Sequence, residues 1–297
     1  MLYEYGNGRR LFTALNYILL AGASLLCIMP LVHVLAVSFS GSAAVTGGEV
    51  LFWPVDFTWN AYQYVANKPE FWQALWRTLE RVVLGVPVSI LLTIMLAYPL
   101  SKETAVFRQR TLYVWVFVFT MLFGGGLIPT YLIVKETHLL DTVWALVIPS
   151  AVNVFNAVLM LNFFRGLPKA LEEAALVDGA GHWKILWRIF VPLSAPSIAT
   201  ITLFTIVFHW NSWFDGLIYM NRPEHYPLQS YLQTVVVQSA LDLIQSGTAQ
   251  DLKMISQIND RTTKAAQIFL GALPILLVYP FLQKYFVKGI TLGSVKE

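Results

Sequence analysis

The stretch "LPKALEEAALVDGAGHWKILWRIFVPL", residues 167–193, is far more polar than the chain on either side of it. Glutamate, lysine, arginine and aspartate crowd together here, whereas the flanking sequence consists almost entirely of apolar residues. The residue types within the stretch favour helix, and two glycines interrupt them near the middle. This polar insert, about residues 166–192, therefore needs an explanation that its apolar surroundings do not share.

The composition of the whole chain defines those surroundings. Its 297 residues are 57% hydrophobic and 12% charged, with a mean hydropathy of +0.60. Soluble domains are about 25% charged, so this chain has too few charged residues to form the polar surface that a soluble protein presents to water. It is therefore predicted to be an all-α membrane protein that crosses the bilayer several times. The net charge of +3 is too small to indicate a nucleic-acid partner, and the single cysteine, Cys27, excludes an intramolecular disulfide.

Six apolar runs are long enough to cross a bilayer as helices. Their predicted ranges are about Ala14–Phe39, Val82–Leu100, Leu112–Val134, Val143–Phe164, Ser194–Phe214 and Ala266–Phe286. The first run follows Arg9 and Arg10, as the apolar core of a signal peptide does, but it is too long for that role. No linker or repeat divides the sequence, so residues 1–297 are predicted to form a single domain.

The distribution of Lys and Arg among the loops predicts the orientation, because these residues are enriched on the cytoplasmic side. Lys102, Arg108 and Arg110 lie together in the short turn between the second and third runs. Both termini are then expected in the cytoplasm, together with the polar insert. Two long loops, residues 40–71 and 215–264, face outward, and the second contains an amphipathic stretch expected to form a helix on the outer mouth.

Within the insert, a first helix is expected to begin at Pro168, a favoured first helical position, and to end at Gly179, which tolerates a left-handed conformation. Glu172 and Glu173 lie near its N-terminus, where the helix dipole favours negative charge. One face has i, i+3, i+4, i+7 spacing, and its two alanines allow another backbone to approach closely. This face comprises Leu171, Ala174, Ala175 and Asp178.

A turn at residues 180–182 leads into a second helix, which is expected to stop at Pro192. The same spacing predicts an apolar face on this helix. That face comprises Trp183, Leu186, Trp187 and Phe190. A helix pair with a flat face, a carboxylate and a glycine hinge suits docking to a soluble partner. An amphipathic loop lying on lipid headgroups fits the same residues, so the insert's own chemistry leaves both interpretations open.

The spacing of the insert also matches a known pattern: Glu-Ala-Ala, three residues, Gly, nine residues, Ile, one residue, an apolar residue and Pro. It resembles the cytoplasmic signature loop of ABC-importer permeases, with Val191 where the family more often has Leu. "AYPLSK" at 97–102 and "HWNSWFD" at 209–215 resemble further elements of this family. "KGITLGSVKE" at 288–297 is similar to the closing pattern of its carbohydrate uptake branch, which includes the maltose-type second permease. "GGGLIPTYL" at 124–132 resembles the subgroup for complex oligosaccharides, including lipoprotein-associated and alginate-like members.

The resemblance implies a type I importer permease fold with six transmembrane helices in the inner membrane. It also implies a second homologous permease subunit, two ATPase subunits that bind ATP and Mg, and an external solute-binding protein that delivers the carbohydrate. The chain has no Gly-x-x-x-x-Gly-Lys-Ser/Thr loop, so it is expected to have no cofactor of its own and not to be an enzyme. In the family, the insert enters a cleft in the ATPase. On this resemblance, the coupling residues are Glu172, Glu173, Ala174, Ala175, Asp178, Gly179, Ile189 and Pro192.

Polar and aromatic residues within or next to the apolar runs are the candidates for a sugar path, because intramembrane polar groups usually face a cavity or another helix. They are Tyr131, Asn153, Asn156, Trp210, Asn211, Trp213 and Asp215. Asn153 and Asn156 are expected to share one helical face, and their alternative role is hydrogen bonding between helices. For the tryptophans, the alternative is an interfacial aromatic belt. In some relatives the partner permease alone holds the sugar, so lining without binding is a further alternative.

Other polar features are interpreted as structural. His33 and His209 are expected to be hydrogen-bonded packing residues, and Arg77, Glu80 and Arg81 form an i, i+3, i+4 charge cluster rather than a site. A membrane enzyme acting on lipids would need a catalytic constellation, and none is visible. An ion-coupled transporter would need carboxylates inside the apolar runs, which contain essentially none. Import of a complex or acidic oligosaccharide is the function predicted, with another solute for the same architecture as the alternative.

Overall fold

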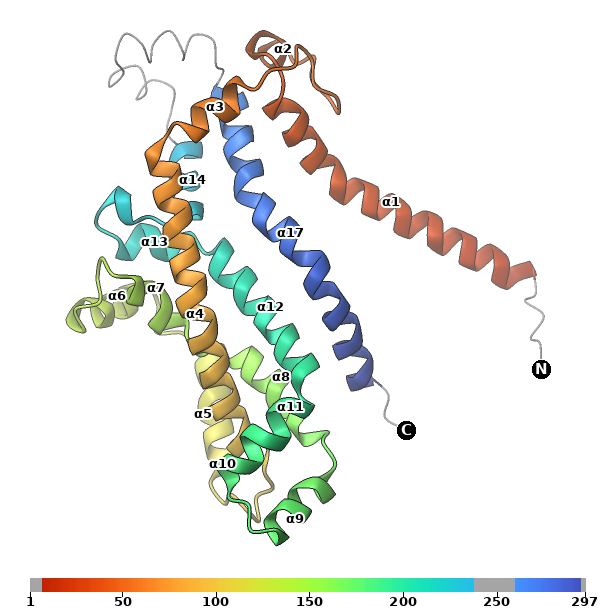
Figure 1. The fold of residues 1–297 in the computed structure, drawn as a ribbon, viewed down its shortest axis with the longest axis vertical. Coiled ribbons are helices and arrows are strands. Elements are labelled where there is room, and N and C mark those ends of the chain that lie inside the picture. Colours follow the sequence, from red (N-terminus) through yellow and green to blue (C-terminus); the bar gives the residue numbers. More distant parts are fainter. Residues whose placement is uncertain (1–6, 238–259, 295–297) are drawn as a thin grey trace. The chain divides into compact units, whose positions relative to one another are not determined.

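A computed structural model describes residues 7–237 and 260–294, and the regular elements in these ranges are all helical (Figure 1). The chain falls into two compact units, and each is described by itself. The first comprises residues 1–69 and 234–273, and the second comprises residues 70–233 and 274–297. The single domain expected over residues 1–297 stays a prediction.

The first unit contains the long helix α1 (Asn7–Ser38), which coincides with the first predicted run. Two short helices follow, α2 (Ser42–Thr46) and α3 (Asn60–Ala66). At the end of α1, the ring of Phe39 stacks on those of Phe57 and Tyr62, with centroid separations of 5.4 and 4.6 Å. These stacked rings attach the segment after α1 to the end of the helix.

In the second unit, α4 (Pro69–Ser101) begins well before the predicted Val82, because the helix continues through the charged residues that precede the apolar run. The third predicted run is not one helix. It consists of α5 (Arg110–Leu122) and α6 (Leu127–Glu136), which meet at 112°. Gly126 allows this break, since its φ of +86° is unfavourable for residues with a Cβ atom.

The fourth predicted run is also bent. It contains α7 (Val143–Val147), the 3-10 turn η1 (Ile148–Ser150) and α8 (Val154–Arg165), with an angle of 49° between its two parts. The side chain of Asn153 caps α8 by accepting a hydrogen bond from the backbone N–H of Asn156 at 3.1 Å. The expected helical face shared by these two asparagines is therefore wrong, because Asn153 precedes the helix.

The first helix of the insert, α9 (Lys169–Val177), forms as predicted, with Pro168 at its N-cap. Gly179 has a φ of +75°, and its N–H donates to the carbonyl of Leu176 at 3.0 Å. The N–H of Ala180 donates to the carbonyl of Ala175 at 2.9 Å, which completes a Schellman motif. The glycine that the sequence placed at the helix end therefore has the conformation that this position requires.

The second helix of the insert differs from the prediction. It consists of α10 (His182–Ile185), the π-helical η2 (Leu186–Phe190) and α11 (Val191–Leu193). Ile185 joins Leu186 and Phe190 in the core, while Trp183 and Trp187 are exposed. An 80° bend at Ser194, just after Pro192, then leads into α12 (Ala195–Asn211).

After α12 come α13 (Phe214–Tyr219), the 3-10 turn η3 (Pro223–His225) and α14 (Leu228–Val237). Helix α14 contains the first part of the amphipathic stretch predicted in the outer loop, and the rest of that stretch lies outside the described residues. The last helix, α17 (Asp260–Ser294), contains the sixth predicted run.

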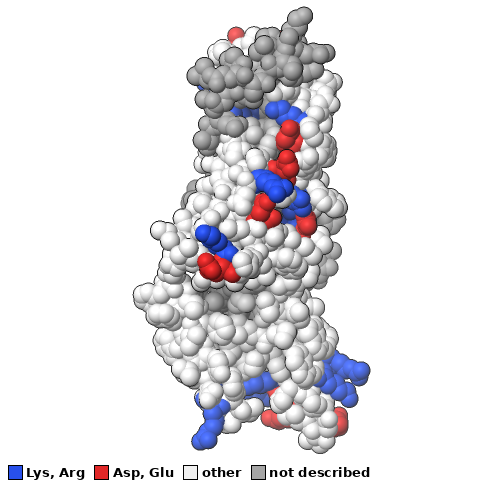
Figure 2. Space-filling model, turned by 90° about the vertical axis from the view of Figure 1, so that its left-hand side faces the viewer, with Lys and Arg blue, Asp and Glu red and all other residues white. Residues whose placement is uncertain are grey.

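Among the described residues, two helices are long and apolar enough to cross a membrane, or up to five spans exist if each bent pair counts as one. The six-span count and the cytoplasmic termini therefore stay predictions. On the face that Figure 2 shows, charged side chains are spread over the upper half and gather again at the lower level, with an uncharged band between them. The lower level belongs to the end of the second unit that carries α9 and α10 (Figures 1 and 2). This distribution fits a chain embedded in a bilayer.

Candidate functional site

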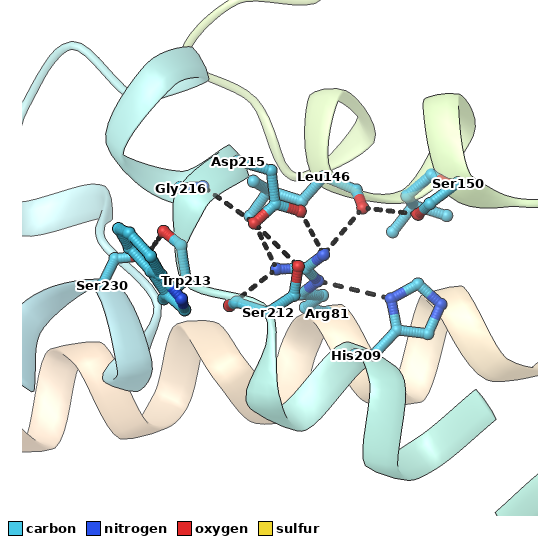
Figure 3. Close-up of polar contacts among 10 residues, drawn as sticks. Arg81, Leu146, Ser150, His209, Ser212, Trp213, Asp215, Gly216 and Ser230 are labelled. Atoms are coloured by element: carbon cyan, nitrogen blue, oxygen red, sulfur yellow. Dashed lines mark hydrogen bonds and ion pairs between the residues drawn. The ribbon is translucent and has the colours of Figure 1, made fainter. Parts of the chain in front are cut away.

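A buried polar cluster surrounds Arg81 on α4, whose side chain is 0% exposed (Figure 3). Its two terminal nitrogens donate to the two carboxylate oxygens of Asp215, with an Nη1–Oδ1 distance of 3.1 Å. Nη1 and Nη2 also donate to the backbone carbonyls of Ser212 and Leu146, each at 3.3 Å, and Nε donates to Nδ1 of His209 at 3.3 Å. The guanidinium has five N–H groups, so each has an acceptor.

This cluster brings distant parts of the chain together. Arg81 comes from α4, Leu146 from α7, and Asp215 from the first turn of α13. The carboxylate of Asp215 also accepts from Ser212 Oγ at 3.1 Å and from the N–H of Gly216 at 2.9 Å. A buried guanidinium is tolerated only when it is paired and fully hydrogen-bonded, and this geometry meets both conditions.

The interpretation of Arg77, Glu80 and Arg81 as one charge cluster is wrong for Arg81. Arg77 does pair with Glu80, with a nitrogen–oxygen distance of 2.8 Å, as the i, i+3 spacing predicts. Arg81 instead enters the interior of the second unit. Sequence spacing points to the nearest carboxylate along one helix, whereas folding supplies Asp215 from a distant segment with two-pronged geometry.

His209 also lines a cavity of about 280 Å³ within the second unit. The cavity lies among α4, the η1–α8 break and α12, and its wall combines aromatic rings with hydroxyl, amide and imidazole groups. The polar lining residues are Ser89, Thr93, Ser150, Asn153, Asn156, Thr205 and His209, and the aromatic ones are Phe155, Phe204 and Phe208. Aromatic faces together with small hydrogen-bonding groups suit a sugar ring.

Two of the residues named from sequence, Asn153 and Asn156, therefore line the same cavity. Both also have structural roles. Asn153 caps α8, and Asn156 Nδ2 donates a hydrogen bond of 3.5 Å to Thr205 Oγ1 on α12. The hydroxyls of Ser89 and Thr93 were not singled out from sequence. Their signal was the i, i+4 spacing of two small polar residues inside the apolar run of α4, which places them on one face.

The remaining sugar-path candidates do not line this cavity. Tyr131, on α6, packs against the apolar cluster that includes Val134. Trp210 is buried, whereas Asn211 and Trp213 are exposed near the end of α12. Asp215 holds Arg81 instead of facing the cavity.

A second ion pair joins the insert to α4. Lys102, directly after α4, places Nζ 2.6 Å from Oε1 of Glu172 on α9. The same nitrogen lies 4.0 Å from the ring centre of Tyr98 and 4.3 Å from that of Phe190. Burial lowers the pKa of Lys102, and the hydrogen bond and charge of Glu172 oppose that shift. The attraction of the ammonium to both rings adds to the attachment of α9 at the end of α4.

The side of α9 that is turned away from Lys102 makes no comparable buried ion pair within the described chain. Glu173, Ala174 and Asp178 are exposed, and Val177 is 88% exposed. Only Ala175 of the predicted flat face packs partly against the core. Leu171 and Leu176 on the same helix are exposed as well, at 43% and 45%, so α9 presents three exposed apolar side chains.

A cavity of about 670 Å³ lies beside α9 and the turn at residues 101–106, and both Glu172 and Glu173 line it. Of the other coupling candidates, Ile189 is partly buried against the core and Pro192 is exposed. No group of three or more His, Cys, Asp or Glu side chains in the described part of the chain has the geometry of a metal site.

The model of the family described as "Binding-protein-dependent transport system inner membrane component" matches residues 64–292. The chain belongs to this family. This match and the relatives described next together confirm the resemblance to ABC-importer permeases of the carbohydrate branch. Helices α1 and α4 are long and apolar enough to cross a membrane, which agrees with a permease embedded in the inner membrane.

Individual relatives are similar over nearly their whole length. The chain is 40% identical to the polygalacturonan/rhamnogalacturonan transport system permease protein YtcP of Bacillus subtilis (strain 168), over 97% of this chain and 99% of the relative. It is 41% identical to Protein LplC of the same organism, over 97% and 95%. A crystal structure of a bacterial ABC transporter involved in the import of the acidic polysaccharide alginate contains a chain 34% identical, with a TM-score of 0.85 and coverage of 95% and 99%.

The family membership assigns the chain to transport. Its relatives are permease subunits of ABC transporters, and such subunits are not themselves enzymes. The type I permease fold expected from the sequence agrees with the family and with the alginate transporter chain. The two features with functional chemistry are therefore the cavity beside Arg81 and the exposed side of α9.

Proposed function

We propose that this permease carries an acidic oligosaccharide across the inner membrane after an external solute-binding protein has delivered it. A second, homologous permease subunit completes the path, and two ATPase subunits that bind ATP and Mg supply the energy. The chain itself holds no cofactor. It crosses the membrane six times, with both termini and the insert in the cytoplasm.

The choice of cargo is supported by the relatives. YtcP is named for polygalacturonan and rhamnogalacturonan, which contain galacturonate, and the similar solved chain comes from an importer of an acidic polysaccharide. Both cargoes are uronate polymers. The cavity in this chain has room for a sugar unit and presents aromatic rings and hydrogen-bonding groups, as a carbohydrate requires.

The single observation that carries the coupling part of the proposal is the attachment of α9. One side of this helix is exposed, while the other side is fixed to α4 through Glu172 and Lys102. Helix α4 also supplies Ser89 and Thr93 to the cavity wall. A partner that binds α9 on the cytoplasmic side and moves it would therefore also move α4, a helix that lines the solute path.

The two glutamates of the insert then have different roles. Glu172 is engaged inside the chain and transmits force to α4. Glu173 is exposed on the docking side and is the carboxylate available to the ATPase subunit. Both side chains line the cavity beside α9, but adjacent residues differ by about 100° around the helix axis, and the ion pair with Lys102 is made by Glu172.

The test is uptake by the purified complex, reconstituted in lipid vesicles with its partner permease, ATPases and binding protein. We expect ATP-dependent uptake of trigalacturonate and little uptake of maltotriose. Glu173→Ala should reduce uptake at least tenfold without changing the melting temperature. Glu103→Ala is the matched control, because Glu103 is an exposed carboxylate on the same side but lies outside the insert.

Each arm has an outcome that contradicts the proposal. Preferential uptake of the neutral trisaccharide would refute the acidic cargo, and uptake of a solute that is not a sugar would favour the alternative permease function. Full uptake with Glu173→Ala would refute the docking role of Glu173. Uptake that persists without ATP would refute the energy source.

A further inference from the structure

Two residues that line the cavity each carry a buried polar atom without a hydrogen-bond partner in the described chain: His209 at Nε2 and Ser89 at its hydroxyl. His209 is 1% exposed and Ser89 is 4% exposed. Burying an unsatisfied donor is costly, and native structures rarely keep two such groups in one place without a reason. Both residues come from helices that face the cavity, α12 and α4.

The contact with Arg81 determines which nitrogen of His209 carries the proton. A guanidinium can only donate, so the bond from Arg81 Nε at 3.3 Å requires Nδ1 of His209 to accept. The proton of the neutral ring must then lie on Nε2. Figure 3 shows this second nitrogen on the side of the ring that points away from Arg81. His209 therefore offers one N–H donor with a fixed orientation.

Space for this orientation comes from a glycine. A Cβ atom on Gly85 would lie 2.8 Å from Nε2 of His209 and 2.9 Å from its Cε1, which is closer than real contacts allow. The absence of a side chain at Gly85, one turn before Ser89, lets the imidazole lie against α4. The donor and the Ser89 hydroxyl are thus held on neighbouring surfaces of the same cavity.

We propose that the His209 Nε2–H group and the Ser89 hydroxyl form a subsite for one sugar unit of the transported oligosaccharide, with Arg81 as the residue that fixes the His209 tautomer. The subsite rests on the proposed function. The two groups donate to an oxygen of the sugar, either a ring hydroxyl or the carboxylate of a uronate. Phe155 and Phe208 supply the apolar walls. This permease then contacts the cargo itself and does more than line the path.

Two substitutions of His209 separate this role from simple packing. Asparagine places its carbonyl oxygen near the position of Nδ1, so His209→Asn keeps an acceptor for Arg81 but loses the donor into the cavity. Glutamine extends its amide to the position of Nε2, so His209→Gln keeps the cavity donor. A purely structural bond to Arg81 predicts that asparagine is the better replacement, whereas the subsite predicts glutamine.

The experiment measures trigalacturonate uptake by the reconstituted complex at saturating loaded binding protein. We expect about a tenfold loss with His209→Asn, a loss of no more than about threefold with His209→Gln, and an intermediate loss with Ser89→Ala. Melting temperature and the ATPase rate with unloaded binding protein report whether each complex is intact. Wild-type uptake with His209→Asn, or a greater loss with His209→Gln than with His209→Asn, would overturn the subsite.

A second substrate identifies the oxygen. Methyl-esterified trigalacturonate keeps the hydroxyls but lacks the charged carboxylates. A defect of His209→Asn confined to the free acid assigns the carboxylate, and an equal defect with the ester assigns a hydroxyl, so either result supports the subsite. If the wild type carries only neutral sugars, the proposed cargo is wrong and the two variants are compared on maltotriose. If the wild type carries no sugar at all, both the proposed cargo and the proposed subsite are wrong.

Discussion

Arg81, in the first half of α4, and Lys102, directly after its end, form ion pairs of different construction with other segments. Arg81 is completely buried, and the five N–H groups of its side chain face five acceptors. Lys102 makes one charged contact, to Glu172, and otherwise lies over two aromatic rings. The arginine fixes its neighbours in several directions at once, whereas the lysine holds a single helix through a flexible stem.

The difference matches what each region has to do. A planar guanidinium with every donor satisfied requires its acceptors to stay in place, so the cluster around Arg81 acts as a fixed frame beside the cavity. An ammonium is a compact charge without directional demands, so Lys102 can follow Glu172 through a modest rotation. We infer that the region around the cavity is rigid and that the attachment of α9 is the yielding end of the same helix.

The largest effect is expected from breaking the rigid pair. Asp215→Ala leaves the guanidinium of Arg81 buried without a counter-charge, which should reduce the free energy of unfolding by about 3–5 kcal/mol. Chemical denaturation of the purified chain in detergent measures this. Arg77→Ala is the control, because its pair with Glu80 is partly exposed and should contribute less than about 0.5 kcal/mol.

The double variant Arg81→Met with Asp215→Leu makes the test sharper. Removing both charges leaves no unpaired ion, so the double variant should be more stable than Asp215→Ala alone. If Asp215→Ala and Arg77→Ala cost the same, the buried frame around Arg81 does not exist.

A smaller loss is expected at the yielding pair. Glu172→Ala leaves the Lys102 ammonium beside two rings without its carboxylate, which should cost about 1–3 kcal/mol. Lys102 lies at the edge of the unit, where its long stem can turn the charge towards water, so the cost should stay below that at Asp215. Glu103→Ala removes the exposed pair with Lys169 between the same two segments and should leave stability unchanged. Equal losses for Glu172→Ala and Glu103→Ala would show that burial of the pair is unimportant.

The same comparison explains which parts of the site the sequence predicted. Helix α9 and its glycine end were predictable, because capping and dipole preferences act within a few residues. The partner of Arg81 was not, because a carboxylate from residue 215 reaches it only after α4, α7 and α13 have packed together. The exposed positions of Trp183 and Trp187 were missed because packing against α4 and α8, which the local pattern does not contain, decides which side of this helix is buried.

The end of α9 offers a third test, of about 1–2 kcal/mol. Gly179→Ala forces a residue with a Cβ atom into a φ of +75°. No heavy atom lies within 4 Å of the added Cβ atom, so the loss of stability arises from the backbone conformation alone. Gly181→Ala is the control, since Gly181 has a φ of −73° and equally open surroundings. Gly181→Ala should be neutral or slightly stabilising. A loss of uptake with Gly179→Ala but not with Gly181→Ala would tie the helix end to coupling.

The smallest effect concerns Asp141, in the turn between α6 and α7, and it tests how far the rigid region extends. Its carboxylate accepts from His225 Nδ1 at 2.8 Å and from the N–H of Asn221 at 3.1 Å, and it faces Arg222 Nε at 3.5 Å. Burial raises its pKa, but these contacts outweigh burial, and the pKa lies below its usual 3.8. Because the folded pKa is the lower one, the stabilisation is complete above about pH 4 and is lost as the pH falls through the folded value.

Asp141→Asn should therefore lower the melting temperature slightly at about pH 6, and the difference from the wild type should shrink as the pH falls through the folded pKa of Asp141. Arg222 is 68% exposed, so water screens its contact and keeps the effect below that of Glu172→Ala. A difference that persists at low pH would mean that Asp141 acts through its turn conformation, with a φ of +61°, and not through its charge. In that case rigidity on this side of α4 would depend on the Arg81 frame alone, and Asp215→Ala would loosen the turn between α6 and α7 as well.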